Sequence, residues 1–143
     1  MEVSDVQRLD LPADPSSVGD ARRFVTRVLS EWGLTEAIDV VALLVSELAT
    51  NAVLHARTAY AVVVSANRED VRVEVLDGSS VQPRRRQNSN AAATGRGVAM
   101  IDRLATSWGT RAGAHGFAKG VWFTVPVTGS PEATWSGDWL EGA

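Results

Sequence analysis

The chain has 143 residues, enough for one domain of ordinary size, and its content of 45% hydrophobic and 22% charged residues is that of a globular protein. A net charge of −3 argues against a general nucleic-acid binder, and the absence of cysteine excludes thiolate catalysis, thiolate zinc sites and disulfides. No run reaches the roughly 18 apolar residues of a membrane helix, and residues 1–5 lack a secretory-signal pattern, so we expect a cytoplasmic protein without a membrane span.

The N-terminal part of the chain shows one alternating segment followed by two segments with helical spacing. Residues 6–11 alternate apolar and polar side chains, as in a short edge strand. From Val18 to Trp32 the apolar residues recur at helical spacing, with Ser16-Ser17 suited to cap the helix and Gly33 to end it. From Thr35 to about His55 the apolar residues are denser, which predicts the core helix of the domain.

A hairpin and a long loop are expected next. The valine-rich segments 60–66 and 71–77 flank the polar stretch 67–70, which is typical of a β-hairpin. Residues 78–95 carry few large apolar side chains, so we expect a long loop that is either a functional lid or disordered. Gly97 then opens a segment with helical spacing.

The C-terminal part predicts a last strand pair and a tail. The strands are expected at residues 106–111 and 121–127, with Lys119-Gly120 serving as part of the structural turn that joins them. Residues 128–143 are rich in Gly, Ser and Pro, so we expect a flexible tail after a single domain that spans residues 1–127.

Glu47 and Asn51 are the first candidate site residues. They lie four positions apart in the core-helix segment, so their side chains share one helical face. A carboxylate and a carboxamide in apolar surroundings need polar partners, and a ligand would supply them. The alternative is a solvated polar stripe on an amphipathic helix, and the pair alone does not decide between the two.

Two further segments have chemistry of their own. Asp77-Gly78 ends a valine-rich strand, where a partly buried carboxylate would accept hydrogen bonds; taken by itself, the pair favours a simple turn. Gly95-Arg96-Gly97-Val98 stands where the polar loop meets a helix, and glycines before a helix N-terminus cradle phosphates or simply anchor a loop. Arg96 and the run Arg84-Arg85-Arg86 either reach phosphate oxygens or form a solvated surface.

Taken in this order, the three segments resemble those of a known family. Glu47-Leu48-Ala49-Thr50-Asn51-Ala52 and Gly95-Arg96-Gly97-Val98, with Asp77-Gly78 between them, resemble the ATPase fold shared by gyrase, heat-shock chaperone, histidine-kinase and mismatch-repair ATPases. Within that group the chain looks most like the stand-alone actinobacterial anti-sigma-factor serine/threonine kinases. The resemblance covers about Leu9 to Pro126.

The resemblance implies a role for each candidate residue. Asn51 would hold the Mg²⁺ ion that bridges the phosphates of ATP. Glu47 would accept the proton of an attacking hydroxyl, with a salt bridge to an arginine as its alternative role, and Asp77 would pair with the exocyclic amine of adenine. The nucleotide-binding residues implied in this way are Asn51, Asp77, Gly78, Gly95, Arg96, Gly97 and Val98.

We therefore expect an α/β fold, a two-layer α/β sandwich whose mixed, mostly antiparallel sheet is covered by helices on one face. The implied function is an ATP- and Mg²⁺-dependent serine/threonine kinase that regulates transcription as an anti-sigma factor. Its protein partners would be an anti-anti-sigma-like protein and a sigma factor, without direct contact to nucleic acid, and a homodimer is left open. The rivals are a binding module that uses nucleotide only to set its shape, and a detached histidine-kinase catalytic domain. The second rival is disfavoured because no dimerising helix with a phosphorylatable histidine fits before the domain.

Overall fold

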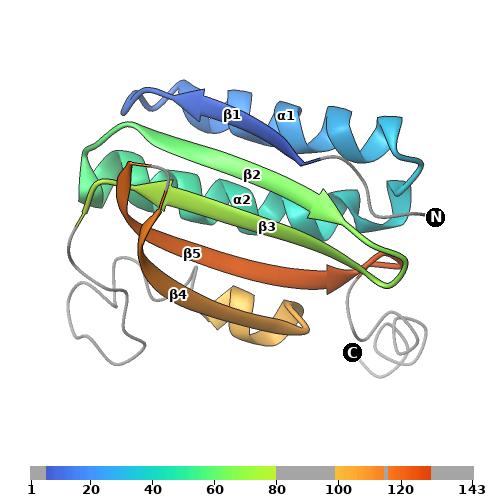
Figure 1. The fold of residues 1–143 in the computed structure, drawn as a ribbon. Helices are drawn as coiled ribbons and strands as arrows, with labels where there is room; N and C mark the ends of the chain where they lie inside the picture. The colour runs from blue at the N-terminus through green and yellow to red at the C-terminus, as the bar shows by residue number, and fades with distance from the viewer. Residues whose placement is uncertain (1–5, 80–98, 115, 130–143) are drawn as a thin grey trace.

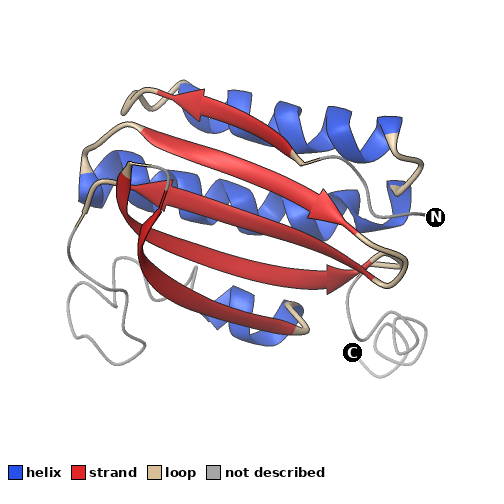
Figure 2. Cartoon of the chain, viewed as in Figure 1, coloured by secondary structure: helices blue, strands red, loops and turns tan. Residues whose placement is uncertain are grey.

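The computed structural model describes residues 6–79, 99–114 and 116–129, which form a two-layer α/β sandwich. Figure 1 shows the strands in one layer and the two long helices packed behind them, and Figure 2 shows the same two layers by secondary structure. This confirms the predicted architecture. The elements are β1 (Gln7–Leu11), α1 (Ser17–Glu31), η1 (Thr35–Ala37), α2 (Ile38–Asn51), η2 (Ala52–Ala56), β2 (Tyr60–Ala66), β3 (Asp70–Asp77), β4 (Ser107–Ala114) and β5 (Phe117–Pro126), with a further helix at residues 99–104.

The five strands form one sheet in the order β1-β2-β3-β5-β4. We expected a mixed, mostly antiparallel sheet; all four described pairings are antiparallel. Strand β5, the last one among the described residues, lies between β3 and β4. Its register places Lys119 directly opposite Asp77 and Val121 opposite Val75. Two residues that are distant in sequence are thereby brought together at the end of β3.

The helix α2 is the core helix that its dense apolar pattern predicts. Leu44, Val45 and Leu48 are buried, and they pack with the valines of the central strands in one hydrophobic cluster. The stretch Thr35–Ala56 is 22 residues long with a mean hydropathy of 1.8, so by length and composition it passes a test for a membrane span. The core helix of an α/β domain passes the same test, and here the apolar face of α2 packs on the sheet.

A five-residue π-helix, η2, follows Asn51 without a break. It ends at Arg57, which adopts the left-handed conformation with φ of 58°. Short π-helical segments are rare and often occur at functional sites. The π-helix gives the end of this helical segment a wider turn than an α-helix has. Shortly after it, the hydroxyl oxygen of Thr58 accepts a hydrogen bond of 2.8 Å from the Gly78 N–H. The C-terminal ends of α2 and β3 are therefore tied together.

The last hairpin differs from its prediction. We expected strands at residues 106–111 and 121–127, with Lys119-Gly120 in the turn; that turn assignment is wrong. Strands β4 and β5 extend much closer to each other, to Ala114 and Phe117, and Lys119 and Gly120 are inner residues of β5. The cause is cross-strand pairing, which outweighs the low strand propensity of the Ala and Gly residues at the end of β4.

The sheet face opposite the helices carries a buried ion pair. Glu74 is only 2% exposed, and its carboxylate accepts two hydrogen bonds from Arg111, of 2.6 and 2.8 Å. These bonds raise the pKa of Arg111 above its ordinary value. Arg72 lies 3.7 Å from the same carboxylate and stacks over the Trp122 ring. The Glu74–Arg111 ion pair fits because Gly120, on the neighbouring strand β5, has no side chain that would occupy the position of the Glu74 carboxylate.

Several predictions lie outside the described residues. These are the lid over residues 80–95, with its arginine run, the start of the following helix at Gly97, and the tail from residue 130 onward. The described part of that helix, residues 99–104, places Ile101 in the same hydrophobic core as α2 and the sheet.

Candidate functional site

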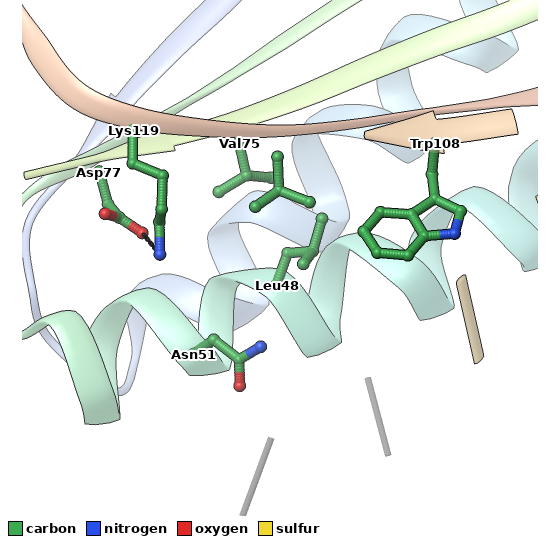
Figure 3. Close-up of a pocket in the computed structure, with 7 residues that line it drawn as sticks. Leu48, Asn51, Val75, Asp77, Trp108 and Lys119 are labelled. Atoms are coloured by element: carbon green, nitrogen blue, oxygen red, sulfur yellow. Dashed lines mark ion pairs between the residues drawn. The ribbon is translucent and has the colours of Figure 1, made fainter. Parts of the chain in front are cut away.

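A pocket opens between the C-terminal half of α2 and the sheet (Figure 3). It encloses about 380 Å³ of space between atoms, a figure that includes open solvent, so it is an open pocket and not a closed cavity. The residues that line it come from α2 and from three strands: Leu48, Asn51, Val75, Asp77, Trp108, Lys119 and Val121. Two of the predicted site residues, Asn51 and Asp77, therefore face one cavity.

Asp77 is held at the end of β3 with its carboxylate in the pocket. It is 5% exposed, so the predicted burial of this carboxylate is confirmed. The Ser79 N–H donates a hydrogen bond of 2.8 Å to Oδ1, and Lys119 Nζ lies 3.5 Å from Oδ2. The turn at Gly78 is close-packed, since a Cβ there would lie 3.1 Å from Thr58. A fixed carboxylate of this kind can accept a hydrogen bond from a ligand that enters the pocket.

Asn51 is the last residue of α2, and Figure 3 shows its carboxamide below the Asp77 end of the pocket. The side chain is half-buried and does not cap the helix that follows. Within residues 6–79, 99–114 and 116–129, the carboxamide has no hydrogen-bond partner. Because a partly buried amide without a partner costs free energy, this position favours a ligand over a structural role.

Glu47 lies one helical turn before Asn51 on α2. It is half-buried, as Asn51 is, but it does not line the pocket that Asn51 and Asp77 share. The predicted stacking of acid and amide on one side of the helix is therefore present.

The middle of the pocket is apolar. Figure 3 shows Leu48 on α2 facing Val75 on β3, and Val121 contributes from the neighbouring strand β5. The Trp108 indole closes the far end, where its Nε1–H donates a hydrogen bond of 2.9 Å to Asp102. Apolar walls with a carboxylate and an ammonium at one end suit a flat heterocycle that carries polar groups on one edge.

Sequence reasoning did not assign Lys119 or Trp108 to the site. The alternation of β5 carries a signal for the lysine: Lys119, Val121, Phe123 and Val125 share one face, and a cation on an otherwise apolar face is unusual. No sequence pattern predicts that Trp108 lines the pocket, because its position there depends on the pairing of β4 with β5.

The other predicted binding residues are in different positions. Gly78 does not line the pocket, and its N–H is used by Thr58. The phosphate-cradle residues Gly95, Arg96, Gly97 and Val98 lie outside the described residues. The described part of the chain has no cluster of three or more Asp, Glu or His side chains that could hold a metal ion. Asn51 fits Mg²⁺ only as one oxygen ligand among phosphate and water oxygens, which is how this ion is commonly bound.

The comparison with known proteins agrees with this geometry. The family model of the histidine kinase-like ATPase domain matches residues 11–118, a span that contains every residue that lines the pocket except Lys119 and Val121. No curated protein sequence matches the chain. Because the family match covers most of the chain and the two-layer fold is the one expected for it, the chain belongs to the histidine kinase-like ATPase domain family.

Proposed function

We propose that the pocket binds ATP with Mg²⁺, with the adenine between the apolar walls and its exocyclic amine at Asp77. Membership of the family supports ATP binding by this domain. The observation that carries the assignment is the convergence of Asn51 and Asp77, from a helix end and a strand end, on one cavity. Asn51 would supply one oxygen ligand to Mg²⁺, and the bound ion would offset phosphate charge.

We further propose that the domain transfers the terminal phosphoryl group to a serine or threonine of a protein partner. In that transfer the hydroxyl oxygen bonds to phosphorus, ADP leaves, and Glu47 takes the hydroxyl proton. The position of Glu47 supports this role, since it lies one turn from Asn51 and outside the base pocket. The proposed partner is an anti-anti-sigma-like protein, with a sigma factor held in the alternative complex, in the cytoplasm.

Transfer of radiolabel from [γ-³²P]ATP to a purified candidate partner tests this proposal. The expected result is labelling of the partner by the parent protein, and a large loss of labelling with Glu47→Ala at unchanged ATP affinity. A partner whose acceptor serine is replaced by alanine serves as the control. ATP binding without transfer to any partner would contradict the kinase assignment and favour a binding module.

A further inference from the structure

Lys119 is the only lysine in the chain, whose other thirteen basic residues are arginines. It is also the most buried cation at the pocket, with a side chain that is 12% exposed. Strand β5 places it opposite Asp77, and Figure 3 shows its ammonium beside that carboxylate on the side that faces α2. A compact ammonium therefore stands at the polar end of the cavity.

The described residues leave the N–H donors of this ammonium unused. The Lys119 Nζ lies 3.5 Å from Asp77 Oδ2, which is an ion-pair distance and longer than a strong charged hydrogen bond. An ammonium has three N–H donors, and the described residues accept none of them in a hydrogen bond. A nearly buried cation with free donors is costly unless a ligand acceptor meets it.

The Asp77 carboxylate, a hydrogen-bond acceptor, lies next to the Lys119 ammonium, a hydrogen-bond donor. The Watson–Crick edge of adenine has the complementary order, with the N6 amine as donor and N1 as acceptor on adjacent atoms. We propose that Lys119 is a second base-reading residue, which donates a hydrogen bond to adenine N1 while Asp77 accepts one from N6. The inference rests on the proposed ATP function and adds a specificity residue to it.

Recognition of both N6 and N1 makes the site selective for adenine over guanine and hypoxanthine. A guanine or hypoxanthine in the same position would place its O6 against the Asp77 carboxylate and its N1–H against the Lys119 ammonium. Both contacts would then be mismatched, and unpaired polar groups of this kind are what discriminate most strongly between related substrates. A lysine that only neutralises Asp77 would act on every adenine nucleotide alike, whether or not N1 is present.

The test compares ATP with 1-deaza-ATP, in which N1 is replaced by C–H, by titration calorimetry on the full chain. The parent protein should bind ATP about 10- to 100-fold more tightly than 1-deaza-ATP, the range for one hydrogen bond with a charged partner. In Lys119→Met this ratio should fall to about one. The matched control is Arg8→Met, which removes an exposed cation paired with Asp10 on β1 and should leave the ratio at the parent value.

A ratio near one in a parent protein that does bind ATP would overturn the inference and leave the ATP function standing. A ratio that Lys119→Met leaves unchanged would overturn it as well, because the lysine would then act only on the charge of Asp77. If the parent binds neither nucleotide, the proposed function itself fails. Should Lys119→Met not fold, ¹⁵N-lysine labelling of the parent gives one side-chain ammonium signal, which should shift with ATP and far less with 1-deaza-ATP.

Discussion

Replacing Gly120 with alanine should destabilise the sheet, because the Glu74 carboxylate already fills the space that a Cβ would enter. The Leu76 side chain would also lie 3.0 Å from the new atom. The carboxylate has little freedom to move, since it is 2% exposed and two hydrogen bonds from Arg111 hold it. The substitution must therefore shift the backbone of β5 or disturb the ion pair.

The size of the effect follows from these two routes. Overpacking a core position costs about 1–3 kcal/mol, and breaking a buried ion pair costs about 3–5 kcal/mol. The Arg111 side chain is 44% exposed, so water would compensate part of the second loss. We expect the free energy of unfolding to fall by about 2–3 kcal/mol, with a melting temperature lower by roughly 6–12 °C.

Urea unfolding followed by circular dichroism measures this loss. Gly19→Ala is the matched control, because its Cβ would meet only the flexible tip of Arg23, and alanine inside α1 should add about 0.5–1 kcal/mol. In a Glu74→Ala background, Gly120→Ala should lose at least half of its cost. An equal cost in both backgrounds, or none in the parent, would refute the steric argument.

Three further predictions concern the pocket and the core. ATP and ADP should raise the melting temperature while GTP should not, and Asp77→Asn should weaken ATP binding by about 1.5–3 kcal/mol in calorimetry. Asn51→Ala should lower the ATP affinity measured in Mg²⁺ toward its metal-free value. Glu47→Ala should leave the ATP affinity intact but slow phosphoryl transfer about 10²- to 10⁴-fold in single-turnover assays. Burial raises the pKa of Tyr60, whose hydroxyl shares a 2.7 Å hydrogen bond with Ser17. Because the hydroxyl pKa is higher in the folded protein, the unfolded chain loses this proton at lower pH. The free energy of unfolding should therefore fall as pH rises above about 10, and Tyr60→Phe should remove this contribution to its pH dependence.

Each of these three predictions has an outcome that would refute it. Equal stabilisation by GTP and ATP would remove the base-reading role of Asp77. A Glu47→Ala variant that transfers phosphate at the parent rate would show that another group takes the proton. Tyr60 is the only tyrosine, so a tyrosinate absorbance titration of the folded protein with an ordinary midpoint would contradict the effect of burial.

The helices and the central hairpin could be predicted because their signals are local. The dense apolar pattern of α2, the valine-rich sequence of β2 and the alternation in β3 act within a few residues of each position. The π-helix after Asn51 could not be predicted, since its sequence Ala-Val-Leu-His-Ala fits an ordinary helix equally well. The ends of β4 and β5 were missed because pairing, and not propensity, extends those strands.

The site was predicted in part for the same reason. The position of Asn51 on a helix face and of Asp77 at a strand end follows from local pattern, and the burial of Asp77 follows from the valines before it. The contact between Asp77 and Lys119 depends on the register of β3 with β5, forty-two positions apart in the chain. No local rule sets that register, so the lysine was assigned to a turn. The same holds for the pair of Glu74 and Arg111.

The placement of the last strand has a consequence for synthesis on the ribosome. Because β5 lies between β3 and β4, a nascent chain that ends before residue 117 has β3 as an open edge, with the backbone N–H and C=O groups on that side unpaired. Such an intermediate also lacks Lys119 and Val121, so the pocket does not yet exist. The pocket therefore forms only when β5 has left the exit tunnel, and until then the open edge of β3 can pair with other chains.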